Sequence, residues 1–286
     1  MNKITNFAYY CKKTYMKKLF FIDAYALIYR AYFAFIKNPR INSQGLNTSA
    51  VLGFVNTVED ILKREKPTHL GVAFDPAGPT FRHEAFEEYK AQRESTPEDI
   101  KKAVPYIKTL LKAYNIPIYE VSGYEADDVI GTLAKQAAKQ GFTVYMLTPD
   151  KDYGQLVEEN IFMYRPKHSG GYEILGVEEV KEKFGIERPE QVIDLLGLMG
   201  DSSDNIPGVA GVGEKTAQGL IQNFGALEDI YENIDDKRIT KGVREKLLRD
   251  ELRLSPIVVE AIKEFKKDKM AIFNALLASL LCNKKV

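Results

Sequence analysis

Leu19-Phe20-Phe21-Ile22-Asp23 is a short apolar run that ends in a carboxylate. The same pattern recurs in the first half of the chain, where apolar runs at residues 70–74, 116–121 and 143–147 each precede acidic residues. Runs of this length and composition favour strands. Because parallel strands end at the same edge of a sheet, the side chains that follow them meet there. The sequence therefore predicts carboxylates gathered along one sheet edge.

Helical spacing fills the intervals between these runs, at residues 50–63, 97–114 and 126–140. Strands that alternate with helices predict an α/β fold with a mostly parallel central sheet and helices on both faces. From about Glu178 the strand pattern fades, and short helical segments separated by glycine-rich turns follow. We therefore expect an α/β core over residues 16–200 and a helical subdomain over residues 201–254. The sequence assigns no role to the extensions at 1–15 and 255–286.

The composition indicates a globular protein without an overall electrostatic field. The chain has 286 residues, 45% of them hydrophobic, and its 40 basic and 40 acidic residues give a net charge of zero. Cys11 and Cys282 form neither a disulfide framework nor a thiolate metal motif, which favours a reducing, intracellular setting. No apolar run reaches the ~20 residues that span a bilayer, and residues 1–15 lack the apolar segment of a secretory signal. We expect a cytoplasmic protein with no membrane contact.

The acidic residues that follow the predicted strands, together with one later pair, point to bound cations. These carboxylates are Asp23, Asp75, Glu125, Asp127, Asp128, Asp150, Asp152, Asp201 and Asp204. Two carboxylates ~4 Å apart repel by roughly 4 kcal/mol at an effective dielectric constant of 20, so converging acids need cations, protons or separation. Oxygen ligands without nearby Cys or His favour Mg²⁺ or Mn²⁺ over zinc.

Local structure offers a simpler alternative for several of these acids. An Asp that follows a strand, such as Asp23 or Asp75, is often a helix N-cap or turn former. Acids in the first turn of a helix, expected for residues 125–128, also gain from the helix dipole. Asp150 and Asp152 are expected to project to the same side of an extended segment, with Lys151 facing away. The pair at 201 and 204 is expected on one face at the start of a helix, where capping does not easily explain both acids.

A glycine-rich segment at residues 206–217 is the next candidate site. Its glycines precede a predicted helix and would expose backbone N–H groups able to hold a phosphate. A nucleotide P-loop is disfavoured because Glu214 stands where a lysine is needed. Binding of the DNA backbone is favoured, and a plain helix-turn-helix connector stays open. The residues expected to contact DNA are Gly208, Gly211, Gly213, Lys215, Thr216, Lys241 and Arg244, within a basic region that also holds Lys237, Arg238, Lys246 and Arg249.

A second basic segment lies between Asp75 and Pro97. Here Arg82, Lys90 and Arg93 are interleaved with Phe81, Phe86 and Tyr89. Cationic and aromatic side chains together suit single-stranded nucleic acid. Four glutamates in the same segment dilute its charge, so a solvated helix is the alternative.

Several of these motifs, taken in order, resemble a known family. They are Phe21-Ile-Asp23, Phe74-Asp75, Phe81-Arg-His83, Tyr89-Lys-Ala-Gln-Arg93, Tyr124-Glu-Ala-Asp-Asp128, Thr148-Pro-Asp-Lys-Asp152 and Gly200-Asp-Ser-Ser-Asp-Asn-Ile-Pro-Gly208. From about Met16 to about Leu254 the chain resembles the 5′-nuclease domain of bacterial DNA polymerase I, in the flap endonuclease family. No acidic position of the family pattern is missing.

The resemblance implies a structure-specific nuclease of replication and repair that cleaves 5′ flaps and 5′ ends of DNA and removes RNA primers. It implies two Mg²⁺ ions, for which Mn²⁺ can substitute, and hydrolysis of the phosphodiester by two-metal chemistry. By family match the first metal region has Asp23, Asp75, Glu125, Asp127 and Asp128, the second has Asp201 and Asp204, and Asp150 and Asp152 lie between. The implied partners are flap or branched DNA and RNA–DNA primer junctions, bound by a monomer near the bacterial nucleoid.

The resemblance also implies a role for each of the two basic segments. Residues at about 79–104 match a mobile helical arch, in which Lys90 and Arg93 approach the scissile phosphate. Arg82 joins the catalytic set, and Tyr89 is expected to stack on a base. The glycine hairpin matches a duplex-binding element in which a monovalent cation such as K⁺ helps to hold the backbone.

A complete DNA polymerase I would continue into proofreading and polymerase domains, which this chain does not contain, so a free-standing nuclease, a truncated product and a fragment are all open. Two other functions are also open. A non-catalytic DNA-junction binder would not need to retain all the acids. A small RNA-cleaving nuclease with an acidic sheet would give no reason for the glycine hairpin.

Overall fold

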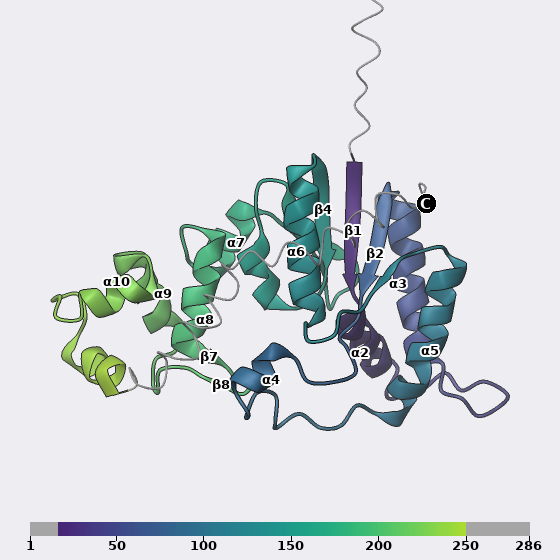
Figure 1. Cartoon of the computed structure of the whole chain (residues 1–286), viewed down its shortest axis with the longest axis horizontal. Helices are drawn as coiled ribbons and strands as arrows, with labels where there is room; N and C mark the ends of the chain where they lie inside the picture. The colour runs from purple at the N-terminus through teal and green to yellow at the C-terminus, as the bar shows by residue number, and fades with distance from the viewer. Residues whose placement is uncertain (1–16, 250–286) are drawn as a thin grey trace, which may run out of the picture.

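The computed structural model describes residues 17–249 (Figure 1). The strands of the main sheet are β1 (Lys17–Asp23), β2 (His69–Ala73), β3 (Ile118–Tyr119), β4 (Phe142–Leu147), β5 (Ile161–Pro166) and β6 (Tyr172–Leu175). A separate small hairpin is formed by β7 (Gly200–Asp201) and β8 (Ile206–Pro207). The extensions at residues 1–15 and 255–286, to which the sequence assigned no role, lie outside the described residues.

The helices of the first half are α2 (Ala24–Ala34), α3 (Ser49–Glu65), α4 (Phe81–Ala85), α5 (Glu98–Ala113) and α6 (Ala126–Lys139). Those of the second half are α7 (Val177–Phe184), α8 (Val192–Met199), α9 (Glu214–Phe224) and α10 (Leu227–Glu232), with short 3-10 helices η1 (Lys151–Leu156) and η2 (Pro189–Gln191). Residues 241–249 are also helical. Among residues 17–249, none of the helices has both the length and the apolar character that crossing a bilayer requires.

The main sheet has the strand order β3-β2-β1-β4-β5-β6. All its pairs are parallel except β5 with β6, which confirms the predicted mostly parallel sheet. The strand β3 is shorter than residues 116–121, where a strand was expected. Pro117 precedes it and has no N–H to donate to a neighbouring strand. The sheet extends beyond the four predicted strands through β5 and β6.

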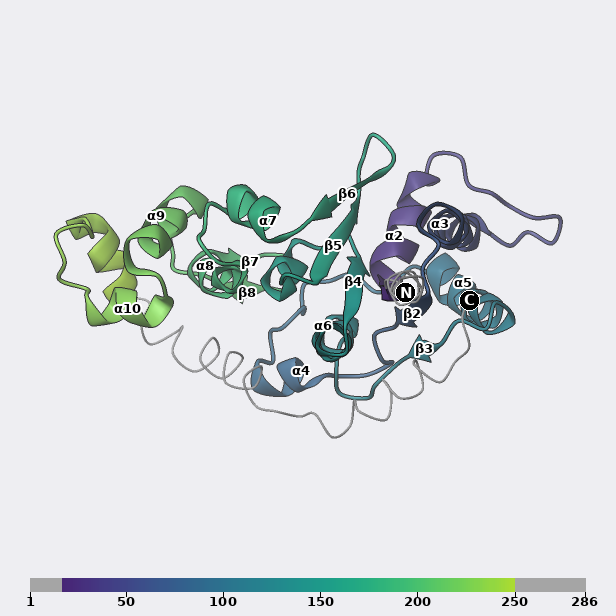
Figure 2. The same cartoon turned by 90° about the horizontal axis from the view of Figure 1, so that it is seen from above.

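The central strand β1 buries side chains on both faces of the sheet. Phe20 and Ile22 pack into a cluster with α2, α3 and α5, whereas Leu19 and Phe21 pack with α6 on the other face. The helices on the two faces are seen in Figure 2. All four side chains are fully buried, and each contributes about 1.5–3 kcal/mol relative to an exposed position. Because β1 lies between β2 and β4, it places Asp23 at the centre of the carboxyl edge.

The helical part after α7 shares a core with the sheet. The hydrophobic cluster beneath α6 continues through Leu195 and Leu198 of α8 to Ile221 of α9 and Ile230 of α10. This confirms the predicted helical C-terminal subdomain, which lies at the far end of the molecule in Figure 1.

The region of Asp201 differs from its prediction. Residues 200–201 pair antiparallel with 206–207 in the β7–β8 hairpin, so Asp201 and Asp204 do not begin a helix. Gly200 has φ +73°, and a Cβ placed on it would lie 2.2 Å from the backbone N of Gly208. A Cβ on Gly208 would lie 2.1 Å from the carbonyl carbon of Met199. This close backbone approach requires glycine at both positions and turns the chain into a hairpin.

The predicted arch segment is only partly helical. The short α4 and the first residues of α5 are helical within 79–104, whereas residues 86–97 form turns and extended backbone. In Figure 1 the segment from α4 to α5 passes beneath the carboxyl edge of the main sheet.

Candidate active site

The carboxyl edge of the sheet borders a cavity of about 560 Å³, which the arch segment helps to enclose. Seven of the nine predicted carboxylates line it: Asp23, Asp75, Glu125, Asp127, Asp150, Asp152 and Asp204. Lys90 and Arg93 of the arch line the same space. Side chains that the topology brings from four strand ends and from the β7–β8 hairpin thus share one cavity.

Asp128 and Asp201 are not among the lining residues. Asp128 accepts hydrogen bonds from both terminal nitrogens of Arg82, at 2.8 and 2.9 Å, and one from the backbone N of Glu125 at the start of α6. Arg82 therefore holds the start of α6 and does not face the cavity. The Asp201 carboxylate accepts from Lys151 at 2.6 Å and from the backbone N of Ser203 at 2.6 Å.

Asp23 serves both of the roles considered for it. Its Oδ1 accepts from the backbone N of Ala26 and caps α2, so the simpler capping role is present. Its Oδ2 accepts from the hydroxyls of Thr148 at 3.1 Å and Tyr153 at 3.2 Å, while the carboxylate still borders the cavity. Asp75 similarly accepts from the backbone N of Ala126 at 2.7 Å, which anchors the first turn of α6.

The shared cavity opposes ionisation of several carboxylates. Burial, and then the charge of Asp75, raises the pKa of Asp23 to about 7. Burial, and then the charge of Asp150, raises the pKa of Asp152 to about 6. Burial and the neighbouring Asp128 raise the pKa of Asp127 well above its ordinary value. A divalent cation would relieve both causes, because it replaces water as a partner and offsets the repulsion between acids.

The donor set fits a hard divalent cation. The acids that line the cavity offer oxygen atoms, which Mg²⁺ and Mn²⁺ prefer. Within residues 17–249, however, no three His, Cys, Asp or Glu side chains converge closely enough to hold an ion in this arrangement. Several of the acids are paired instead with the chain's own cations, so binding an ion requires an exchange of partners.

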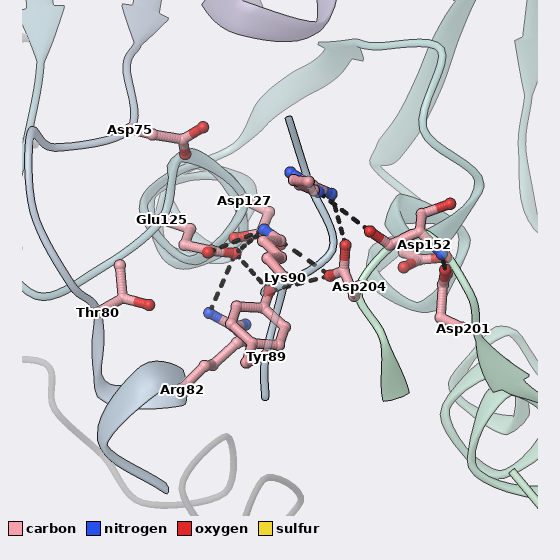
Figure 3. Close-up of polar contacts among 12 residues, drawn as sticks. Asp75, Thr80, Arg82, Tyr89, Lys90, Glu125, Asp127, Asp152, Asp201 and Asp204 are labelled. Atoms are coloured by element: carbon pink, nitrogen blue, oxygen red, sulfur yellow. Dashed lines mark hydrogen bonds and ion pairs between the residues drawn. The ribbon is translucent and has the colours of Figure 1, made fainter. Parts of the chain in front are cut away.

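Besides Arg82, the arch supplies Lys90 and Arg93 among those cations (Figure 3). The Nζ atom of Lys90 lies 2.9 Å from both carboxylate oxygens of Glu125 and 3.8 Å from Asp204. Arg93 donates to Oδ1 of Asp204 at 2.6 Å. Burial alone would raise the pKa of Glu125, but the charges of Lys90 and Arg82 outweigh it and hold this pKa below its ordinary value. The cations that the resemblance assigns to the substrate phosphate are thus bound to carboxylates here.

Tyr89 does not have the exposed ring expected of a base-stacking group. Its side chain is buried, its hydroxyl lies 2.9 Å from both Glu125 and Asp204, and its ring packs edge-on against His83. Lys90 covers one face of the ring at 4.7 Å. In this structure Tyr89 orders two carboxylates and presents no free face to a base.

Lys151 supplies a further cation, and its predicted orientation is wrong. The chain enters η1 at Lys151 instead of remaining extended, so this side chain does not face away from its acidic neighbours. Its Nζ lies 2.9 Å from Asp152 and 2.6 Å from Asp201. The alternation expected of a strand therefore does not apply to residues 150–152.

The glycine hairpin leads directly into α9. Gly213 is the N-cap residue of α9, and both Lys215 in the first turn of that helix and Gly213 itself are exposed. Thr216 donates its backbone N–H to the Gly213 carbonyl, and Gly208 serves the close approach described above. The Gly211 carbonyl accepts from the Lys246 ammonium at 2.8 Å, so the basic helix at 241–249 is tied to the hairpin.

The two basic residues predicted to contact DNA from the 241–249 helix differ in their surroundings. The Lys241 side chain is 90% exposed. Arg244 is largely covered and donates to the Ile234 carbonyl at 2.7 Å, which links two parts of the subdomain. Lys241, whose ammonium lies 4.0 Å from the exposed Glu245, can therefore reach a ligand, whereas Arg244 already has an internal role.

Sequence reasoning missed several residues that shape the cavity. Thr148 and Tyr153 hold Asp23, and Tyr29 lines the cavity from α2. Gln92 and Asn205 join the arch to the β7–β8 turn. Thr148, Gln92 and Asn205 lie within the motifs that carry the family resemblance, and Tyr153 directly follows Asp152, but nothing in the sequence assigned a role to any of them or to Tyr29.

Two family models match the chain in succession. The first, 5′-3′ exonuclease, N-terminal resolvase-like domain, matches residues 18–185, and the second, 5′-3′ exonuclease, C-terminal SAM fold, matches residues 187–270. Among curated relatives, the 5′-3′ exonuclease of Aquifex aeolicus is 40% identical over 218 residues, which cover 76% of this chain and 73% of that protein. DNA polymerase I of Bacillus subtilis is 48% identical over 236 residues, covering 82% of this chain and 26% of the polymerase. The chain thus spans about a quarter of the length of that polymerase.

Solved structures share the fold. The bacteriophage T5 5′-exonuclease with bound zinc has a TM-score of 0.72 at 21% identity, covering 93% of this chain and 99% of that one. A complex of the T5 flap endonuclease with DNA and metal ions has a TM-score of 0.70 at 21% identity, covering 92% of this chain and 98% of that one. The fold is therefore that of a 5′-nuclease. The chain belongs to the 5′-3′ exonuclease family, which confirms the predicted enzyme class.

Proposed function

We propose that this chain is a structure-specific, divalent-metal-dependent 5′-nuclease that hydrolyses phosphodiester bonds in 5′ flaps and 5′ ends of DNA and in RNA primers. The observation that carries the proposal is the shared cavity, which seven of the nine predicted carboxylates line together with Lys90 and Arg93 of the arch. The flap substrate, the primer-removal role and the individual residue roles are parts of this proposal.

Two Mg²⁺ ions, or Mn²⁺ in their place, are the proposed cofactors. In this proposal Asp23, Asp75, Glu125 and Asp127, which line the cavity, would hold the first ion, Asp201 and Asp204 would hold the second, and Asp150 and Asp152 would lie between the two. When bound, such ions activate a water molecule and stabilise the leaving oxygen of an in-line displacement at phosphorus. Asp128, tied to Arg82, would support the first position from outside the cavity.

The chain's own cations would act on the substrate phosphate. Lys90 and Arg93 are within reach of the carboxylates and would release them when a divalent ion takes their place. Their charges would then face the phosphate, where negative charge develops during displacement. Arg82, which keeps both of its hydrogen bonds to Asp128, would hold α6 in position throughout.

Duplex DNA is proposed to lie against the glycine hairpin. The exposed start of α9 at Gly213 and Lys215 and the exposed Lys241 would contact the phosphate backbone. In this proposal a monovalent cation such as K⁺ binds beside the hairpin carbonyls, one of which already accepts from Lys246. These contacts add affinity but do not touch the scissile bond.

A cleavage assay on 5′-flap DNA with and without Mg²⁺ tests the proposal. The Asp150→Ala/Asp152→Ala double variant should lose cleavage by at least about 10³-fold while binding of the flap in Ca²⁺ survives. The matched control is Glu159→Ala, which removes an exposed carboxylate just before β5 that is not among the residues lining the cavity. Undiminished cleavage by the double variant would refute the metal assignment.

The same assay separates the alternative functions. A non-catalytic junction binder would bind the flap but show no cleavage in Mg²⁺. A small RNA-cleaving nuclease would turn over single-stranded RNA faster than branched DNA. Mg²⁺-dependent cleavage at the branch supports the proposed function over both.

A further inference from the structure

A turn of the arch is docked on the turn that joins β7 to β8. The side-chain amide of Gln92 donates to the carbonyls of Ser202 at 2.8 Å and Ser203 at 3.2 Å. In the opposite direction, the amide of Asn205 donates to the Glu88 carbonyl at 2.8 Å. Two segments about 110 residues apart in sequence are therefore joined by reciprocal side-chain amides.

Neither amide belongs to the cavity. Gln92 and Asn205 are absent from the residues that line it, and all three of their contacts are to backbone carbonyls. Such bonds fix the separation and the orientation of two backbones, but they leave the charges of the cavity unchanged. Their effect on chemistry would therefore be indirect.

The docked turn sets the position of Lys90. Lys90 has a φ of +56°, a backbone conformation that residues with a Cβ rarely adopt. Its backbone N–H donates to the Asp204 carbonyl at 2.9 Å. With the backbone held in this way, the Lys90 side chain reaches Glu125 while Arg93, three residues on, reaches Asp204. A strained conformation of this kind persists only where surrounding contacts hold it.

Asn205 is suited to its side of the contact. It has φ +58°, in the left-handed region that asparagine tolerates better than most residues with a Cβ. The same residue type thus allows the backbone turn after Asp204 and supplies the amide that reaches Glu88. Glycine would keep the turn and remove only the amide.

We propose that Gln92 and Asn205 are positioning residues, which dock the arch on residues 202–205 and so hold Lys90 and Arg93 over the carboxylates. This inference rests on the proposed nuclease function and deepens it. Because the two amides arrange catalytic groups and do not bind the duplex, their loss lowers kcat and leaves the affinity for DNA unchanged.

The test uses Gln92→Met, which keeps the length of the side chain without the amide, and Asn205→Gly. Each should lower the single-turnover cleavage rate at saturating flap DNA by about 3- to 10-fold, the loss expected for one or two net hydrogen bonds. The dissociation constant for the flap in Ca²⁺ should not change. The matched control is Gln222→Met, which removes a similar exposed amide that donates to the Gly185 carbonyl at 2.8 Å, away from the cavity. It should cleave at the parent rate.

A double-mutant cycle separates positioning from a general loss of stability. In the Lys90→Ala/Arg93→Ala background, Gln92→Met should cause no further loss of rate, because the groups that it positions are gone. A full additional loss in that background would overturn the inference, as would an increased rate in Gln92→Met, which would mark the contact as inhibitory. Parent-level rates in both Gln92→Met and Asn205→Gly would also overturn it.

If the unaltered chain does not cleave flap DNA in Mg²⁺, the proposed function itself fails, and that outcome is distinct from all of these.

Discussion

The carboxylate cavity and the glycine hairpin both concentrate charge, but they do so in opposite environments. In the cavity several charged groups are covered and paired, as where Lys90 meets a buried Glu125. At the hairpin the charges lie on the surface, and the side chain of Lys241 is 90% exposed. Charges interact strongly where water is excluded and weakly where solvent and salt screen them. The same residue types should therefore govern the rate of chemistry in one region and affinity in the other.

The two regions also differ in how much of their geometry is already fixed. Around the cavity, ion pairs join the arch to the start of α6 and to the β7–β8 turn, as Figure 3 shows for Lys90 with Glu125 and Asp204. At the hairpin, the Gly211 carbonyl accepts from Lys246, but the side chains of Lys215 and Lys241 extend into solvent. Substitutions in the cavity should consequently disturb several groups at once, whereas those at the hairpin should act nearly independently.

The largest effect should come from removing a cavity cation. Lys90→Ala is expected to lower the single-turnover rate by about 10²- to 10³-fold, because it removes a charge that would face the phosphate in the transition state. The affinity for flap DNA in Ca²⁺ should fall much less. Rapid-quench measurements at saturating enzyme give the rate, and fluorescence anisotropy gives the affinity.

Lys101→Ala is the matched control for this variant, since it removes a half-exposed lysine that pairs with Glu98 on the surface of α5. Its rate and affinity should equal those of the parent. If Lys90→Ala instead lowered the affinity for DNA and left the cleavage rate unchanged, the cavity cations would act on binding, as the hairpin cations are expected to do.

The second effect is a pH dependence of folding that originates in the cavity. The pKa of Asp23 is about 7 in the folded protein, against an ordinary value near 4, and that of Asp152 is about 6. Between these values the folded state holds more protons than the unfolded state. The free energy of unfolding of the metal-free protein should therefore fall as pH rises from about 4 to about 7. For Asp23 the loss is on the order of 4 kcal/mol at most.

Urea unfolding in EDTA at pH 5 and pH 8 measures this loss. Added Mg²⁺ should reduce or reverse it, because the ion binds the deprotonated carboxylates of the folded state. Glu125 and Asp201, whose pKa values are lowered, act below this pH window and do not mask it. Asp23→Asn should flatten the dependence. Stability that rises from pH 5 to pH 8 in EDTA would show that the acids of the cavity do not repel one another as the structure indicates.

Some features of the fold and of the site could be predicted from the sequence, and others could not. The convergence of Asp23, Asp75 and Asp150 could be predicted, because parallel strands bring their carboxyl ends together whatever the details of packing. The start of α6 next to Glu125 could also be predicted from helix spacing and the acids of its first turn. The first feature follows from the common direction of the strands, and the second depends on residues within a few positions of each other.

Other features of the site depend on distant partners and could not be predicted. Lys151 faces Asp201 because η1 begins there, and Asp201 is 50 residues away. The β7–β8 hairpin depends on the backbone approach of Gly200 to Gly208, which no helical periodicity reveals. The docking of Gln92 on Ser202 joins segments that the sequence gives no reason to pair.

The smallest effect should come from the exposed cations of the hairpin region. Lys215→Ala and Lys241→Ala should each weaken binding to duplex DNA a few-fold and reduce the slope of log K against log salt concentration by about 0.9. The cleavage rate at saturating DNA should not change, because neither side chain lines the cavity. Lys63→Ala, on the surface of α3 with 76% of its side chain exposed, is the control and should leave the slope unaltered. Titrations at several salt concentrations measure the slope. A drop in the saturated cleavage rate without a change in slope would mean that these lysines act on the chemistry, and that exposure does not separate the two regions.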